Sequence, residues 1–498
     1  MTAYDYLNRA VTTTDTVIDA GGATRTRTET TTCDNGGYST RAKTSQATGG
    51  IGSTLPSQTT IYDTATGAVS SITDGTSTSN TTYDDFGRVK TYTDSAEATG
   101  DARNIVTTTY DNAGRVATLA DAESTVTNTY NQNGDPRDHP TSMTVSGITG
   151  AFTGRYDIEG RLIEQTWPNG LIQTAVFDAE GEQLDRRQVQ DQRWLEETVA
   201  PNIHGQWRIQ NSTGANVNRD QTYTYDNLGR LTLTGDTGSG SCLSHRYQFN
   251  ANSNRTARIT YGVGSDGKCQ STTPQTTQTS TYDAADRLQP AGTHAGLAYD
   301  AYGRITTVPA ADLTAGIGNL TATYYTNDLV RSLTHDGTTV TYDLDAGARL
   351  KTWTNSNSGV VKTNHYGDST SDSPDWISET TDHSPWTRNI TDLGGNLAGT
   401  VNHTGTVTWQ TVNLHGDVTA TTAGSATEPD ASYTTDEYGI PVGGASPTVT
   451  VGWAANNVPA RRSAASPSWA SASMQLRSAD SSRPTPSREG TPTPTPTP

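Results

Sequence analysis

The sequence predicts an all-β protein: a spiralling strip of antiparallel β-hairpins that forms part of a hollow shell, followed by a disordered C-terminal tail. Three observations predict this fold. A seven-residue phrase, Tyr-Asp, two or three variable residues, Gly-Arg and an aliphatic residue, recurs along the chain. Thr and Tyr are abundant, and both suit pleated sheet surfaces. The hydrophobic content is 31%, below the roughly 45–50% of ordinary domains, which fits a thin wall better than a solid core.

The recurring phrase marks an array of one small unit, because repetition at a period of roughly 20–50 residues is typical of repeat proteins. Between Tyr62 and Phe177 successive landmarks lie 20 to 27 residues apart. That spacing holds two strands and two turns but no helical crossover. Full copies are YDDFGRV from Tyr83, YDNAGRV from Tyr110, YDIEGRL from Tyr156, YDNLGRL from Tyr225 and YDAYGRI from Tyr299; looser copies start at Tyr4, Tyr62, Phe177, Tyr282 and Tyr342, and degenerate ones at Tyr130, Phe249 and Tyr324.

Each copy predicts the turn of a β-hairpin. In TTTYDNAGRVATL the residues on either side of the turn alternate with the period of two that marks a strand. Asp111 is expected to accept hydrogen bonds from the backbone just ahead, and Gly114 to supply a positive φ. Arg115 is expected to lie beside Asp111 or to stack on a neighbouring Tyr. The predicted structural turn residues are Tyr83, Asp84, Gly87 and Arg88; Tyr110, Asp111, Gly114 and Arg115; Tyr156, Asp157, Gly160 and Arg161; Tyr225, Asp226, Gly229 and Arg230; and Tyr299, Asp300, Gly303 and Arg304.

The hairpins are expected to pair with one another. An isolated hairpin is marginally stable in water, so each must add to the next and build a twisted antiparallel strip. One segment is open to two interpretations: residues 182–199 predict either a short helix or a long strand pair.

The charge excludes one class of function and the hydropathy another. The formal net charge of -18 opposes binding to nucleic acid, which depends on basic contacts to phosphate. No run approaches 18 apolar residues, so no membrane span is expected. The N-terminus lacks a basic segment followed by an apolar one, so we expect no signal peptide in this chain. Tyr4 lies inside a repeat copy, which suggests a fragment of a longer array.

The cysteines leave two interpretations open. Cys242 and Cys269 flank the degenerate copy RYQFNANSNRT. If that copy forms a hairpin, its arms bring the two together, and a disulfide would indicate an oxidising, extracellular setting. Cys33 would then be left over. The other interpretation is three unpaired small residues.

The sequence contains no recognisable catalytic, cofactor or metal motif. Its nine histidines are scattered, and HExxH, GxSxG and GxxxxGK[ST] patterns are absent. We therefore expect no cofactor, no metal site and no catalytic residues in the array. Two alternatives to a structural scaffold stay open: a carbohydrate-binding surface module that uses tryptophans such as Trp167 and Trp409, and, least favoured, an autoproteolytic or glycan-cleaving enzyme.

The repeated units, taken together, resemble those of the RHS or YD-repeat family, which includes bacterial polymorphic toxins, wall-associated proteins and the teneurin shell of animals. The resemblance covers Tyr4 to Tyr438, and RYQFNANSNRT, NLHGDVTATT and YTTDEYGIP are similar to actinobacterial members. It implies a strip of hairpins wound into a hollow shell that, in toxin members, encloses a C-terminal toxic domain. It also implies an extracellular or cell-surface location for the intact parent.

The C-terminal part departs from the family pattern. Members usually end their shell with an Asp-Pro motif where an aspartyl autoprotease releases the cargo, but the only Asp-Pro here is Asp135-Pro136, so that activity is not carried over. After Trp453 the sequence changes to Pro, Ser, Ala and Arg. We expect a repeat array over 1–452 and a disordered tail over 453–498. A frame change or truncation that removed the shell's cap and the toxin is one explanation; a genuine linker is the other.

Overall fold

The chain folds almost entirely into β-strands. The computed structural model describes residues 1–33, 41–94, 105–131, 135, 137–190, 193–215, 217–238, 241–265, 269–313, 318–379, 385–424 and 428–439. Within these ranges there are 36 strands and two short 3₁₀ helices, and no α-helix. The predicted tail, 453–498, lies outside the described residues.

The strands form two large antiparallel sheets, of which the first has 23 strands. Each of its strands pairs with the next along the chain. Its strands are β1 (Thr2–Tyr4), β2 (Ala10–Ile18), β3 (Thr24–Cys33), β4 (Ala42–Gly49), β5 (Gln58–Tyr62), β6 (Val69–Thr73), β7 (Thr78–Tyr83), β8 (Val89–Thr93), β9 (Ile105–Tyr110), β10 (Val116–Ala120), β11 (Thr125–Thr129), β12 (Ser142–Val145), β13 (Phe152–Tyr156), β14 (Leu162–Thr166), β15 (Ile172–Phe177), β16 (Gln183–Val189), β17 (Arg193–Pro201), β18 (Trp207–Gly214), β19 (Val217–Tyr225), β20 (Leu231–Gly238), β21 (Ser241–Phe249), β22 (Arg255–Tyr261) and β23 (Thr276–Thr279).

The second sheet has 13 strands with the same sequential antiparallel pairing. It follows the 3₁₀ helix η2 (Gly292–His294), and η3 (Ala310–Asp312) lies between two of its strands. Its strands are β24 (Ala298–Tyr299), β25 (Ile305–Val308), β26 (Leu320–Tyr324), β27 (Val330–His335), β28 (Thr338–Leu344), β29 (Leu350–Asn355), β30 (Val361–His365), β31 (Trp376–Glu379), β32 (Trp386–Thr391), β33 (Leu397–Asn402), β34 (Val407–Val412), β35 (Val418–Ala423) and β36 (Ala431–Ser432).

The all-β prediction is confirmed, and the segment 182–199 is settled. That segment forms the strand pair β16–β17, in which Arg187 lies opposite Glu196, and not a helix. The charged residues of this segment, whose arrangement also suggested a short helix, lie opposite one another on the two strands and can pair across them.

Each repeat hairpin carries a β-bulge at its tyrosine. Tyr83 pairs with Val89 after a register shift between Thr82 and Tyr83. The same shift recurs in the other full copies. A bulge bends its strand and increases the right-handed twist, so one bulge per repeat adds a bend of one sense at regular intervals.

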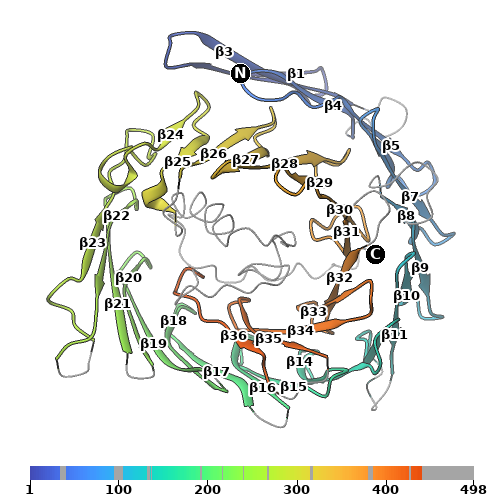
Figure 1. Cartoon of the computed structure of the whole chain (residues 1–498). Coiled ribbons are helices and arrows are strands. Elements are labelled where there is room, and N and C mark those ends of the chain that lie inside the picture. Colours follow the sequence, from blue (N-terminus) through green and yellow to red (C-terminus); the bar gives the residue numbers. More distant parts are fainter. Residues whose placement is uncertain are drawn as a thin grey trace.

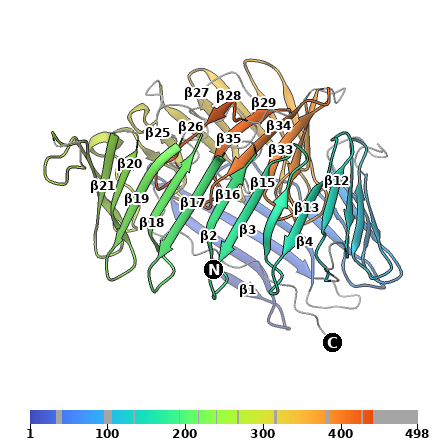
Figure 2. The ribbon, with the colours of Figure 1, turned by 90° about the horizontal axis from the view of Figure 1, so that it is seen from below.

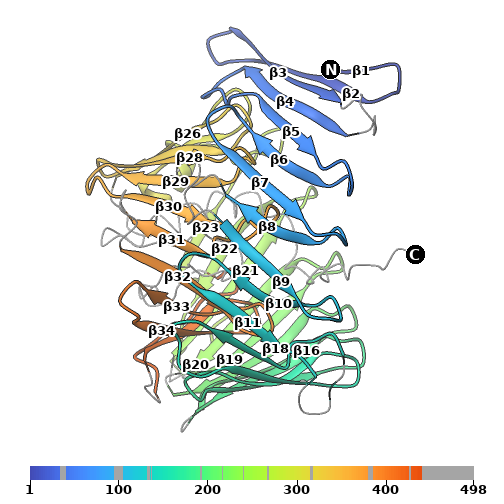
Figure 3. The same cartoon turned by 90° about the vertical axis from the view of Figure 1, so that its right-hand side faces the viewer.

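The repeated bends wind the strip into a spiral. We call β1–β23 the first winding, which follows the outer path in Figure 1, and β24–β36 the second winding, which follows a narrower inner path. Figure 2 shows neighbouring strands of the first winding tilted alike along the wall. Figure 3 shows β26–β34 beside β1–β11. A parallel bridge between Ser53 and Tyr325 brings the second winding alongside the start of the first.

The two edges of the strip differ in their turns. Because successive strands alternate in direction, every second turn lies at the same edge. All repeat turns therefore lie along one edge, which we call the turn edge. The other hairpin turns, such as those closed by Asp121 with Ser124 and by Trp167 with Leu171, lie along the opposite edge.

Candidate functional site: the seam between the windings

The repeat turn is held by a pattern of groups that recurs from copy to copy, shown by the copy at Tyr110. The N–H of Asp111 donates to the carbonyl of Arg115 (2.9 Å), and Gly114 adopts a φ of 87° that other residues rarely reach. Asp111 Oδ1 accepts the N–H groups of Ala113 and Arg115 (2.9 Å each). Asp111 Oδ2 accepts from Arg115 Nε at 2.8 Å. The side-chain bond with Arg115, followed by its N–H, lowers the pKa of Asp111.

Tyr and Arg join each repeat to its neighbours. The Tyr110 hydroxyl donates to the carbonyl of Val89 in the preceding repeat (2.8 Å). The Arg115 guanidinium lies 4.2 Å from the centre of the Tyr130 ring in the following repeat. Arg therefore both pairs with its own Asp and stacks on the next aromatic ring. The other full copies make the same tyrosine-to-carbonyl bonds, from Tyr83 to Val69, Tyr156 to Pro140, Tyr225 to Trp207 and Tyr299 to Leu288, and the same stacking, of Arg88 on Tyr110, Arg161 on Phe177, Arg230 on Phe249 and Arg304 on Tyr324.

The same turn also forms in the looser copy near Tyr342, but it is made by different residues from those that the sequence pattern indicated. In YDLDAGARL the turn is closed by Asp345 with Arg349, not by Asp343. Leu344 takes the place of the tyrosine and pairs with Leu350 after the bulge. The copy is therefore LDAGARL, two residues further along the chain than the Tyr-Asp pair in the sequence.

The turn edge of the second winding is packed against the first winding. We call this contact the seam. It joins the second winding's repeat turns to the opposite edge and the neighbouring face of the first winding. Contacts across it include Arg27 with Asp328, Gln58 with Ala346, Tyr92 with Arg349, Asp121 with Arg388, Gln165 with Asp392, Arg186 with Asn413, Glu197 with Leu414, Arg219 with Thr435, and His245 with Glu437.

A hydrophobic core crosses the seam. Phe152 and Trp167 from the first winding meet Trp409 from the second, with all three ring centres 6.0 Å apart. Trp409 Nε1 donates to the carbonyl of Gly424 (2.9 Å), which satisfies its polar group. The buried members of this core are Met143, Phe152, Trp167, Leu171, Trp194, Ile390, Ala398, Val401 and Trp409. The two windings are therefore held by apolar burial as well as by hydrogen bonds.

Burial of these tryptophans bears on the carbohydrate-binding alternative. Trp167, Trp194, Trp353, Trp376 and Trp409 are all buried. A ring that stacks on a sugar must present a face to solvent, so these five rings are not available for an external sugar.

Charged groups are also buried at the seam. The Asp121–Arg388 ion pair has side chains only 5% and 6% exposed. The pair Asp345–Arg349 is similarly enclosed, and Arg349 donates further to the Tyr92 hydroxyl and to the carbonyls of Asp368 and Ser371. Removing one partner of such a buried ion pair is strongly destabilising, because the other charge is left buried without compensation.

The stability is expected to fall as the pH rises through 6 because of Asp375. Burial raises the pKa of Asp375 to about 6. The carboxylate lies so close to Gly367 that a side chain at that position would collide with it. Asp121, Asp368 and Asp94 add repulsion, which Arg388 opposes. Because the folded pKa lies above that of the unfolded chain, the folded state holds the extra proton, and its contribution is lost above pH 6. A shift of about two pKa units corresponds to at most ~3 kcal/mol.

The measurement is the denaturant midpoint of the native chain and of Asp375→Asn between pH 5 and pH 8. The native midpoint should fall over this range and the variant's should change less, with the variant more stable at pH 8. Glu437, whose pKa is lowered to about 2, acts only as the pH falls below 4.5, outside this range. Parallel curves for the two proteins would contradict the prediction.

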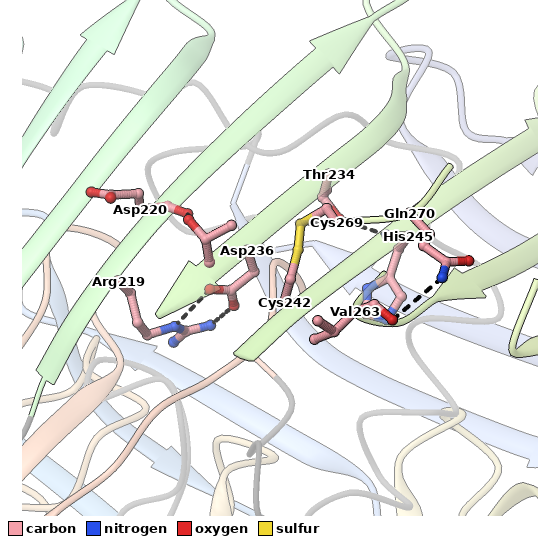
Figure 4. Close-up of a disulfide and its surroundings, with 10 residues drawn as sticks. Arg219, Asp220, Thr234, Asp236, Cys242, His245, Val263, Cys269 and Gln270 are labelled. Carbon is pink, nitrogen blue, oxygen red and sulfur yellow. Dashed lines mark hydrogen bonds and ion pairs between the residues drawn. A yellow bond between two sulfur atoms is a disulfide. The ribbon is translucent and has the colours of Figure 1, made fainter. Parts of the chain in front are cut away.

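Cys242 and Cys269 are joined by a disulfide, shown in Figure 4 beside the Arg219–Asp236 ion pair. Their Cα atoms are 5.1 Å apart, and Cys242 lies at the start of β21. The bond closes a loop across the β21–β22 hairpin. Cys33 is a free cysteine.

Removing this bond is expected to lower the free energy of unfolding. The chain-entropy relation gives about 3–4 kcal/mol for a loop of 27 residues. The variant Cys242→Ser with Cys269→Ser should show the loss in a denaturant titration. Cys33→Ser, which breaks no bond, is the matched control and should leave the midpoint unchanged. Equal midpoints for all three proteins would be evidence against the bond.

Two further features are absent from the described ranges. No group of three or more His, Cys, Asp or Glu residues there is arranged to hold a metal ion. No helix in the same ranges is both long enough and apolar enough to cross a membrane.

The chain is similar in fold to parts of toxin complexes. No family model and no curated protein matches it. Crystal structures of TcdB2-TccC3-TEV and of TcdB2-TccC3 without its hypervariable C-terminal region match 92% of the chain with TM-scores of 0.64 and 0.63, at 14% and 15% identity. The Photorhabdus luminescens Tc holotoxin pore with the mutation TccC3-D651A matches with a TM-score of 0.64 at 13% identity. This chain spans 25% of the length of those chains. The likeness is therefore one of fold alone.

Proposed function

We propose that this chain is a wall segment of an encapsulating shell, in an RHS-type secreted toxin or cell-surface protein, and that the wall itself has a structural role. The observation that carries the proposal is the two-winding spiral of repeat hairpins held by a buried seam. The similarity in fold to TcdB2-TccC3 supports it. The intact parent would act outside the cell and would enclose a C-terminal toxin as cargo.

The turn edge of the first winding supports the idea that the wall continues. In two repeat turns of the second winding a large apolar or aromatic residue is packed against the first winding: Tyr302 against Gly50 and Arg27, and Leu393 against Leu162 and Gly154. The corresponding residues of the first winding are exposed to solvent. They are Tyr6 (89%), Phe86 (83%), Ile158 (90%), Ile203 (96%) and Leu228 (70%). These side chains recur along one edge of the strip, and in the proposed shell they are the groups on which a further part of the wall would pack.

Protection of a passenger tests the enclosing role. An unstructured peptide with several protease sites is fused after Pro498, and its cleavage rate is compared with that of the same peptide fused to an unrelated soluble protein. The wall is expected to slow cleavage at least tenfold. A variant with an opened seam, Trp409→Ala, is expected to lose the protection. Equal cleavage rates on both carriers would overturn the proposal.

A further inference from the structure

Three polar side chains meet where the strip passes from the first sheet to the second. Ser280 follows β23, His294 ends η2 and Asp312 ends η3. Ser280 Oγ lies 3.1 Å from His294 Nε2. The other ring nitrogen, Nδ1, lies 2.8 and 2.9 Å from the two carboxylate oxygens of Asp312. Each ring nitrogen of His294 thus faces a different partner.

We propose that Ser280, His294 and Asp312 form a hydrolytic triad that cleaves carboxylic esters. The Asp312 carboxylate accepts a hydrogen bond from His294 Nδ1–H and so fixes the tautomer in which Nε2 has a free lone pair. That lone pair is directed to the Ser280 hydroxyl, which is the relation between base and nucleophile in serine hydrolases.

Solvent access separates this triplet from a similar one inside the wall. The His294 and Asp312 side chains are 16% and 17% exposed, and Ser280 is partly exposed. Ser378, His365 and Asp94 follow the same order of groups, with Ser378 Oγ 3.1 Å from His365 Nε2 and Asp94 Oδ2 3.6 Å from His365 Nδ1. Ser378 and His365 are at most 1% exposed. Ser280 contacts solvent and Ser378 does not, so the buried triplet is a control that the chain itself supplies.

The proposed reaction accounts for every bond that forms or breaks and for every proton that is transferred. Ser280 Oγ attacks the ester carbonyl carbon while its proton passes to His294 Nε2, and the C=O electron pair moves to the oxygen. The intermediate then breaks its C–O bond to the alcohol, which leaves with the proton from Nε2. Water adds to the acyl-serine, giving one proton to Nε2, and the Ser280–acyl bond breaks as that proton returns to Oγ. The products are a carboxylic acid and an alcohol.

A competing role for Ser280 is to support the adjacent repeat. Ser280 also hydrogen bonds to the phenol of Tyr282, whose hydroxyl donates to the carbonyl of Arg255 (2.9 Å). In that role the serine would be unreactive, and its removal would affect stability alone.

The experiment treats the full chain with a fluorophosphonate probe, locates the label by peptide mass spectrometry, and measures hydrolysis of p-nitrophenyl acetate. Ser280 is expected to carry the label. Ser280→Ala should abolish labelling and ester hydrolysis, and Asp312→Asn should slow both at least 100-fold, because the tautomer is no longer fixed. Ser378→Ala should leave both unchanged. Thermal melts confirm that each variant is folded.

Three results would overturn the proposal: no label on Ser280, equal labelling or hydrolysis in Ser280→Ala, or an unchanged rate in Asp312→Asn. The outcome is separate from that of the enclosing role, since Ser280→Ala should protect a fused passenger as well as the native chain does.

Discussion

Replacement of Trp409 by alanine is expected to lower the free energy of unfolding by about 3–5 kcal/mol, the usual cost of removing a buried aromatic side chain. Trp409 is 3% exposed and lies against Phe152 and Trp167 of the other winding. Its loss leaves a cavity at the centre of the seam and frees the carbonyl of Gly424. The measurement is a denaturant titration followed by far-UV circular dichroism.

Phe86→Ala is the matched control for this prediction. Phe86 is 83% exposed at the turn edge of the first winding, so its removal should change stability by less than about 0.5 kcal/mol. If both variants unfold at the same denaturant concentration as the native chain, the core at residue 409 does not hold the windings together.

Replacement of Arg349 by methionine is expected to cost about 3–5 kcal/mol, whereas Arg287→Met should cost at most ~1 kcal/mol. The two arginines occupy the same position in the repeat turn, each beside an Asp four residues earlier. The Arg349 and Asp345 side chains are 8% and 5% exposed, while those of Arg287 and Asp283 are 46% and 29% exposed. Removing Arg349 leaves the Asp345 carboxylate buried and without its ion-pair partner.

Adding Asp345→Asn to Arg349→Met isolates the charge effect. If the loss comes from the uncompensated carboxylate, the double variant should regain a good part of the stability. Equal costs for Arg349→Met and Arg287→Met would mean that the seam adds nothing to the intrinsic stability of the turn. The two single variants and the double variant are compared with the native chain in the same denaturant titration.

The hairpins were predictable from the sequence because the signals that specify them are local. Asp111, Gly114 and Arg115 lie within five residues of one another, and their hydrogen bonds and positive φ follow from residue type. The hydroxyl bond from the tyrosines to the preceding repeat was not predicted, although the presence of Tyr rather than Phe or Leu in all five full copies is a signal for it.

The seam could not be predicted in the same way. It joins residues such as Gln165 and Asp392, which are 227 positions apart, and nothing near either residue specifies the other. The Asp side chain of the repeat turn is 29% exposed at Asp283 and 5% exposed at Asp345, since the two turns lie at different positions in the spiral. The triplet at Ser280 was missed for a related reason: its three members lie in segments that no repeat motif marks.

The distance along the chain between the two halves of the apolar core has a consequence during synthesis. Trp167 leaves the ribosome 242 residues before Trp409 (409 − 167), and at about 5–20 residues per second that interval lasts roughly 12–48 s. Throughout it, the rings of Phe152, Trp167 and Trp194 lack the residues that later cover them. The nascent chain therefore exposes an aggregation-prone apolar surface for many seconds. Its yield in cells should depend on chaperones that bind such surfaces during translation.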